Sequence, residues 1–355
     1  MASLLHQRDA ALRRPRRFRG VVTVLRTALV IFATLIGLAA ITFTIGRFLP
    51  TDPVIAAIGD HASTELYQQT RLAMGLDRPI PAQFLTYLYR LAQGDLGQSL
   101  LTGQPVTTDL AGFFPATFEL STAALLIGLV IGIPLGVIAA ARQGKLTDHL
   151  IRVVSLTGYS VPVFWFGLVG LVFLYVKLGV VPGPGRIDVA YEYTIEAKTG
   201  LILVDTLLAG NWDAFVDAAH HLLLPSTILG YYSAAYIARM TRAFMIDALH
   251  HEFITTARVK GMSATNVLWS HALPSVAGPL ITVIALAYAS LLEGAVLTET
   301  VFAWPGLGLY ITNALFNADL NAVLGGTLVV GGAFLLLNMA TEALQQRLDP
   351  RGQRA

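Results

Sequence analysis

Residues 252–274 read EFITTARVKGMSATNVLWSHALP and lie between two long apolar segments. If the first part is helical, Phe253, Ala257 and Gly261 recur every four residues, so one face carries an aromatic ring and then two very small residues. Such a face lets another surface approach the backbone closely. Gly261 can end the helix because glycine adopts the left-handed conformation freely, and Pro274 disfavours a helix that runs on. The stretch predicts a short helix, a sharp turn and a return into the next apolar segment.

The composition predicts an all-α polytopic membrane protein. Of 355 residues, 55% are hydrophobic and 13% are charged, and the mean hydropathy is +0.63, whereas soluble domains are about 25% charged. The net charge of +2 gives no reason to expect a nucleic-acid partner. The chain contains no cysteine, which excludes disulfides, thiol catalysis and cysteine-ligated metals.

Several segments are long and apolar enough to cross a bilayer, which takes about 20 residues for roughly 30 Å of hydrocarbon. We expect transmembrane helices at 24–46, 118–141, 153–176, 222–245, 277–300 and 320–342. An even number of spans puts both termini on one side, and lysine and arginine are denser in the short segments of that side. Both termini and the 252–274 stretch are therefore expected in the cytoplasm.

This pattern divides the chain into a basic arm (1–20), a first span (21–48), a long external loop (49–117) and a five-helix core (118–351) with a cytoplasmic loop at 246–275. The first span is too long for the apolar part of a signal peptide and lacks a small-residue cleavage site, so we expect it to remain uncleaved. The arginines of the arm would hold the N-terminus in the cytoplasm, with RNA or lipid binding as the alternative.

Both external segments allow two interpretations. In the first external segment, 49–117, apolar residues at helical spacing predict a helix over 82–93, followed by a turn over 94–99. That loop either orients a pathway or meets a partner, or it is a surface loop without a role. The second, 177–221, is acidic, which suits a cationic ligand or basic partner but is more simply explained by a solvated surface.

Prolines and glycines inside two expected spans predict bent helices that pack closely. Pro134 lies beside Gly132 and Gly136, and Pro162 follows Gly158. Bent helices of this kind build pathways, but they also build rigid cores.

Glu293 lies inside the expected fifth span, where a carboxylate is costly and normally faces a partner or a wet cavity. It either lines a pathway, meeting a substrate amino group or a polar residue of a partner, or it is protonated or bonded to a hydroxyl such as Ser290 or Thr298. Glu119 and Glu342 lie at the ends of spans, where interfacial solvation accounts for them.

No motif for covalent chemistry or nucleotide binding is present in the sequence. The runs G-x-x-x-x-G-K-[ST], H-E-x-x-H and G-x-S-x-G are absent. The adjacent histidine pairs at 220–221 and 250–251 point to different sides of a helix, so each is a poor chelate. We expect no catalytic residue, metal or cofactor in this chain.

The 252–274 stretch resembles the cytoplasmic loop of permeases of binding-protein-dependent ABC importers. That loop reads roughly E-A-A, three residues, G, nine residues, I-x-L-P. Here TTA at 255–257, Gly261 and LP at 273–274 hold those positions, while Thr255 replaces the glutamate and His271 the isoleucine. The peptide-permease branch is closer, since it has T-A-R-x-K-G followed by H-A-L.

Further pieces occur in family order and extend the resemblance over nearly all of residues 21–351. They are FLPTDP at 48–53, GDLG at 94–97, GIPLG at 132–136, GYSVP at 158–162, FAWPGLG at 302–308 and LDP at 348–350. The arginine arm and Glu293, where the family commonly has a small residue, are departures. The chain resembles the B-type permease subunit of dipeptide/oligopeptide ABC importers.

The resemblance implies a six-helix type I importer permease that pairs with a second related permease, two ATPases that bind ATP and Mg²⁺, and an extracytoplasmic substrate-binding protein. It implies that the loop docks on an ATPase through Glu252, Phe253, Thr256, Ala257, Arg258, Lys260, Gly261, Leu273 and Pro274. Substrates would be di- or oligopeptides, with nickel chelates, glutathione, and sugars or opines as alternatives. Two other classes of function are alternatives: a secondary transporter or channel, and a structural membrane scaffold. A secondary transporter or channel should carry paired ionisable residues within its spans or inverted repeats.

Overall fold

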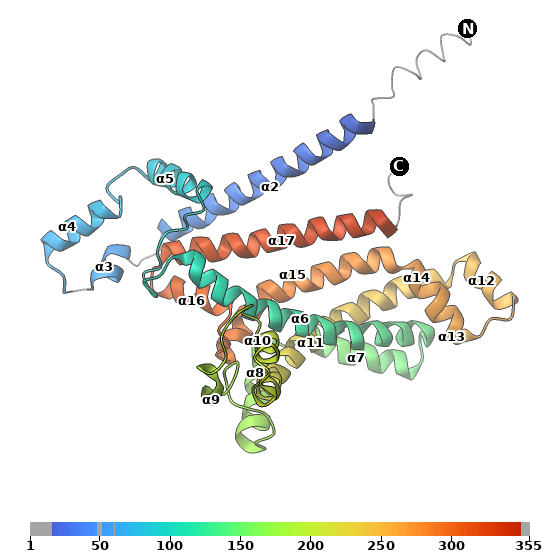
Figure 1. Ribbon diagram of the computed structural model, residues 1–355. Helices are drawn as coiled ribbons and strands as arrows, with labels where there is room; N and C mark the ends of the chain where they lie inside the picture. The colour runs from blue at the N-terminus through green and yellow to red at the C-terminus, as the bar shows by residue number, and fades with distance from the viewer. Residues whose placement is uncertain (1–15, 48–51, 60, 349–355) are drawn as a thin grey trace, which may run out of the picture.

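The computed structural model describes residues 16–47, 52–59 and 61–348, and these are almost entirely helical (Figure 1). The long helices are α2 (Arg16–Arg47), α6 (Val106–Ala141), α7 (Leu146–Ser160), α11 (Trp212–Leu249), α15 (Ala277–Val301) and α17 (Leu320–Leu348). The short ones are α3 (Pro53–Ile58), α4 (Thr64–Ala73), α5 (Ile80–Ala92), α8 (Val163–Gly170), α9 (Val189–Glu192), α10 (Ile202–Leu208), α12 (Glu252–Val259), α13 (Ala264–Asn266), α14 (Leu273–Ser275) and α16 (Leu307–Phe316). Two π-helices complete the set, η1 (Leu171–Lys177) and η2 (Val267–Ala272).

Within the described ranges the only β-pairing is an isolated bridge between Gln98 and Pro105, so the all-α expectation is confirmed there. The basic arm up to residue 15, residues 48–51 of the first loop and the end of the chain from 349 lie outside the described residues. α2 begins at Arg16, so the last residues of the predicted arm are already helical.

α6 and α11 form the centre of the bundle, because glycines on α6 let the two backbones approach each other. A Cβ atom on Gly132 would lie 2.8 Å from the carbonyl oxygen of Ala234, and one on Gly136 would lie 2.6 Å from Cβ of Thr241. The predicted close packing around these glycines is therefore confirmed. α6 continues as one helix through Pro134, and α15 packs against both central helices.

Four described helices are long and apolar enough to cross a membrane: Ala28–Gly46 of α2, all of α6, all of α15, and Leu320–Gln345 of α17. The pair Leu146–Ser160 and Val163–Lys177 qualifies together as a fifth span, although it is bent by 94°. α11 has 38 residues but is less apolar and does not qualify. Six spans are compatible with this bundle if α11 is the sixth.

The bend that Pro162 predicts in the span at 153–176 is confirmed, and the expected start at 153 is late because α7 begins at Leu146. The bend follows from Pro162, because the residue before a proline is driven to extended angles, and Val161 has φ −89° and ψ 132°. The expected starts at 118 and 222 are also late, since α6 begins at Val106 and α11 at Trp212. Hydropathy finds the apolar middle of such helices and misses the polar turns that extend them.

The loop between α2 and α6 is structured, as predicted. Asp52 caps α3 through the Val54 amide, with Pro53 in the first turn. The helix expected at 82–93 is confirmed as α5. The turn that follows α5 is confirmed by left-handed glycines, Gly94 at φ 79° and Gly97 at φ 82°.

Figure 1 places α12 and α13 at one end of the bundle and α3, α4 and α16 at the other, with α2 running beside α17. These are called the α12 end and the α16 end below. The stretch that the sequence analysis began from therefore forms a protruding tip at the α12 end.

Candidate functional site

The inward face of α12 anchors this short helix to the bundle. Ile254 is fully buried and Ala257 is 7% exposed, at the i, i+3 spacing that puts both on one side of a helix. They join one apolar cluster with residues from α6, α11 and the segment that follows α12: Val137, Ala140, Met245, Ala248, Val267, Ala272 and Val276. The inward face of α12 is therefore part of the same apolar cluster as α6, α11 and η2.

Gly261 ends α12 as predicted, with φ +80°. The Gly261 amide donates to the carbonyl of Arg258 at 3.0 Å, and the Met262 amide donates to the carbonyl of Ala257 at 3.3 Å. This pair of bonds is a Schellman motif, which needs a left-handed residue where the helix stops. Met262 packs onto the apolar cluster, so the cap also fixes the direction of the outgoing chain.

The outward face of α12 mixes charge with apolar surface. Glu252, Phe253, Thr256, Arg258 and Lys260 are all exposed, as is Gly261 beyond the helix. Glu252 lies in the first turn and Arg258 in the last, where each charge complements the helix dipole. The side chains of Arg258 and Lys260 make no ion pair with any described residue, so both cations are free to meet a partner.

The expected face of Phe253, Ala257 and Gly261 is not the outward face. Phe253 is 44% exposed, but Ala257 points into the bundle. The four-residue spacing places two residues near each other without saying which side of the helix faces the core. Ile254, one residue after Phe253, sets the inward side because it is larger than Ala257 and completely buried.

The prediction that Pro274 interrupts the helical path is also wrong. η2 leads directly into α14, and Leu273, just before the proline, is helical at φ −59° and ψ −46°. The wider turns of a π-helix accommodate a proline that lacks an amide donor. The interruption falls at Val276, with φ −100° and ψ 7°, immediately before α15.

A buried ion pair ties α7 to α11 near the α12 end. The Arg242 guanidinium donates to both Asp148 carboxylate oxygens, from Nε at 2.6 Å and from Nη2 at 2.8 Å. Asp148 also accepts from the Gly144 amide at 3.0 Å. Because Arg242 and the α12 anchor residue Met245 share one turn of α11, this pair stiffens the helix that receives α12.

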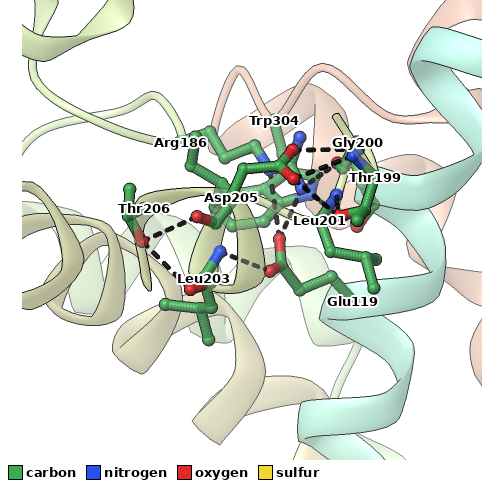
Figure 2. Close-up of polar contacts among 11 residues, drawn as sticks. Glu119, Arg186, Thr199, Gly200, Leu201, Leu203, Asp205, Thr206 and Trp304 are labelled. Atoms are coloured by element: carbon green, nitrogen blue, oxygen red, sulfur yellow. Dashed lines mark hydrogen bonds and ion pairs between the residues drawn. The ribbon is translucent and has the colours of Figure 1, made fainter. Parts of the chain in front are cut away.

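Toward the α16 end, a second buried pair, the Glu119–Arg186 clasp, joins α6 to the loop after η1 (Figure 2). Arg186 Nη2 lies 2.5 Å from Glu119 Oε2 and 2.8 Å from the Gly200 carbonyl oxygen. Glu119 Oε1 accepts from the Leu203 amide at 3.0 Å. The expectation that interfacial water accounts for Glu119 is therefore wrong, because the residue is 8% exposed and both carboxylate oxygens accept hydrogen bonds from protein groups.

Asp205 continues the same network and revises the picture of an acidic rim. Its carboxylate accepts from the Thr199 amide and hydroxyl at 2.8 and 2.7 Å and from the Gly200 amide at 2.9 Å. It is 2% exposed. This acid shapes its own loop, whereas Glu192, Glu196 and Asp213 remain exposed.

Glu299, which sequence reasoning missed, holds the α16 end together. It is fully buried near the end of α15 and accepts from Thr117 Oγ1 at 2.5 Å and from the Leu309 amide at 2.9 Å. Thr117 in turn accepts from the Leu307 amide at 2.7 Å, and the Trp304 indole donates to the Ala116 carbonyl at 2.9 Å. A signal was available in FAWPGLG, whose small residues leave the first amides of α16 open to a carboxylate.

Glu293 occupies a different environment on the same helix. It is exposed on α15 and makes no hydrogen bond or ion pair with a described residue. The interpretation in which a hydroxyl of Thr298 holds it finds no support, since Thr298 Oγ1 is buried without a partner. Its position on α15 also separates it from the nine residues predicted around α12.

Two families describe nearly the whole chain. "Binding-protein-dependent transport system inner membrane component" matches residues 132–354, and the N-terminal membrane-component family of the same systems matches residues 19–121. The Di/tripeptide transport system permease protein DppB of Pseudomonas aeruginosa (strain UCBPP-PA14) is 42% identical over 90% of this chain and 94% of that protein. The Probable D,D-dipeptide transport system permease protein DdpB of Escherichia coli (strain K12) is 42% identical over 89% of this chain and 92% of that protein.

Among solved structures, an inward-facing form of the MetNI methionine ABC transporter aligns with a TM-score of 0.49 and 16% identity, covering 66% of this chain and 93% of that one. The relationship to known proteins rests on the family matches and on the two permease relatives.

Proposed function

The chain belongs to the family of binding-protein-dependent transport system inner membrane components, and from this premise we propose that it is the permease subunit of a peptide ABC importer. The two relatives are each 42% identical to this chain, and their names support peptides as the substrate class. The apolar helices support a multi-pass protein of the inner membrane. We place both termini and the α12 end in the cytoplasm, in line with the distribution of lysine and arginine.

The observation that carries this proposal is the construction of α12. Its outward cations Arg258 and Lys260 form no ion pair with a described residue, while its inward residues Ile254 and Ala257 pack into one apolar cluster with α6 and α11. We propose that the outward face, centred on Phe253, Arg258 and Lys260, docks on an ATPase subunit. The buried Ala257 and the half-buried Leu273 would then set the position of that face, while Gly261 and Pro274 are exposed beside it.

In this scheme the chain performs no covalent chemistry, and ATP and Mg²⁺ bind to two partner ATPases. When ATP draws the ATPases together, α12 moves with them, and the apolar cluster passes that movement to α6 and α11. The pathway between this chain and a second, related permease then opens outward to receive peptide from a substrate-binding protein. A change between inward-facing and outward-facing states requires central helices that move as a unit. The Asp148–Arg242 pair and the close packing of α6 against α11 hold these helices together.

Uptake of labelled di- and tripeptides tests the proposal, in cells that lack this gene and other peptide importers. Restoring the gene should restore ATP-dependent uptake, and Phe253→Ala or Arg258→Glu should reduce it while the amount of protein in the membrane is unchanged. Thr64→Ala, an exposed change on α4 at the opposite end of the bundle, is the control and should transport normally. Absence of uptake with the wild-type gene would move the substrate to the nickel-chelate, glutathione or sugar branches.

Co-purification separates an importer subunit from a secondary transporter, a channel or a scaffold. We expect the tagged protein to bring down two ATPase subunits and a second permease. Recovery of the chain alone, or of a complex with itself, would contradict the proposed assembly.

A further inference from the structure

α15 carries two carboxylates six residues apart, and the fold treats them in opposite ways. Glu299 is fully buried and accepts hydrogen bonds from Thr117 and the start of α16. Glu293 is exposed and bonds to no described residue. Glu299 therefore joins α15 to α6 and α16, whereas Glu293 makes no such connection with a described residue.

Glu293 lies well within the membrane-spanning length of α15. At a rise of about 1.5 Å per residue, it is roughly 24 Å from Ala277 and roughly 12 Å from Val301 along the axis. Hydrocarbon lies beside most of that length, and a carboxylate there requires water, a counter-charge or protein cover. Since this chain supplies no cover, the surface around Glu293 does not face lipid.

That surface is a continuous stripe along α15. Leu286, Ser290, Glu293, Leu297 and Thr300 are all exposed, and their spacing of four, three, four and three residues places them on one side of the helix. The other sides of α15 contact α6, α8, α11, α16 and α17. The stripe is thus the open side of a helix that lies inside the bundle, with a carboxylate at its centre and with two hydroxyl residues, Ser290 and Thr300, alternating with two leucines.

We infer that Glu293 lines the water-filled translocation pathway and selects for positive charge on the peptide, either its terminal ammonium group or a cationic side chain. This inference rests on the proposed function. A water-filled wall satisfies the solvation that the carboxylate needs, and a passing cation gains Coulomb attraction without a fixed binding partner. An exposed carboxylate in water attracts a unit charge at 4 Å by roughly a factor of five in occupancy, which biases passage without trapping the substrate.

The absence of cysteine from the chain permits a direct test of the aqueous placement. Glu293→Cys should react with a charged, membrane-impermeant methanethiosulfonate reagent in the assembled complex. Two matched variants are Ala295→Cys, buried on the same helix, and Phe32→Cys, 62% exposed on the peripheral helix α2. We expect Glu293→Cys to react at least ten times faster than either. Equal rates for Glu293→Cys and Phe32→Cys would overturn the placement.

Charge selectivity is tested by the ratio of uptake of Ala-Lys to uptake of Ala-Glu, with the substrate-binding protein unchanged so that its preference cancels between variants. Glu293→Gln should lower this ratio by about fivefold or more, and Glu293→Lys should lower it further. An unchanged ratio in both variants, with normal amounts of complex, would overturn the selective role.

The two experiments also separate this inference from the proposed function. If the wild-type complex imports no peptide, the proposed function fails and peptide selection by Glu293 fails with it. The thiol reaction needs no substrate, so it still reports whether Glu293 faces water.

Discussion

At Gly261 the backbone angle, and not a lack of space, excludes other residues. A Cβ atom there would meet nothing within 4 Å, yet φ is +80°. A side chain in this left-handed region costs roughly 1–2 kcal/mol. The residue is therefore a conformational requirement of the end of α12, and any partner must accept the chain direction that it imposes.

Gly261→Ala should weaken coupling by shifting the end of α12, with a cost of about 1–2 kcal/mol in local stability. Peptide uptake and the ATPase activity of the purified complex should both be measured. Gly278→Ala is the control, because that glycine also has open space around it but no left-handed angle. Equal losses in the two variants would show that φ at 261 is not the cause.

The Glu119–Arg186 clasp shows how a charged residue at the end of a span can be structural. The side chains are 7% and 13% exposed, so removing one partner leaves the other charge buried without compensation. Removal of one partner from a buried pair typically costs about 3–5 kcal/mol.

Glu119→Gln should lower the melting temperature of the protein in detergent by several degrees, and the double variant Glu119→Gln/Arg186→Gln should recover part of the loss. Glu196→Gln provides the comparison, since the Glu196–Lys198 pair is exposed with its charged atoms 3.9 Å apart. Exposed pairs contribute about 0–1 kcal/mol. A large effect at Glu196, or none at Glu119, would contradict this assignment.

At the scale of elements, the contact between α6 and α11 organises the bundle. Gly128, Gly132 and Gly136 bring the α6 backbone against Ser233, Ala234 and Thr241 of α11. Close backbone approach of this kind provides van der Waals contact that apolar lipid cannot replace. The same two helices hold the α12 anchor, so the proposed coupling depends on the interface that also stabilises the bundle.

Gly132→Ala should destabilise the protein by roughly 1–3 kcal/mol, since the added methyl group would overpack against the Ala234 carbonyl. Gly112→Ala lies on the same helix with open space around it, and there alanine should be neutral or slightly stabilising because of its better helix propensity. Thermal unfolding of both variants measures the difference. Equal melting temperatures would mean that the interface relaxes around the methyl group.

At the scale of the whole molecule, the number of spans depends on α11. The helix is 38 residues long and links the α16 end to the α12 end, but its apolar content falls short of that of the other spans. Its buried small and polar residues face α6, where other protein and not lipid solvates them. A helix at the centre of a bundle needs less hydrophobicity than one that faces lipid on all sides.

Single-cysteine labelling of the cysteine-free chain should show that α11 crosses the membrane. Tyr193→Cys, before α11, and Val259→Cys, after it, are 88% and 82% exposed. We expect an impermeant maleimide to label the first from outside in spheroplasts and the second only in inverted vesicles. Labelling of both from the same side would contradict the six-span topology.

Local patterns were sufficient for much of this protein. Apolar runs located the middle of the long helices, glycine spacing predicted the close packing of α6, and Gly261 marked the end of α12. Each of these depends on residues a few positions apart, because backbone angles, helix faces and hydropathy are set by neighbours in the chain.

Contacts between distant segments settled the rest. Glu119 meets Arg186 across 67 positions and Glu299 meets Thr117 across 182, so neither partner is visible in the local pattern. Ala257 turns inward because Ile254 fits the cluster on α6 and α11, and Glu293 stays uncovered because no neighbouring helix reaches it. Whether a side chain is buried, paired or open depends on which surfaces the packed helices bring together, and that is a property of the assembled bundle.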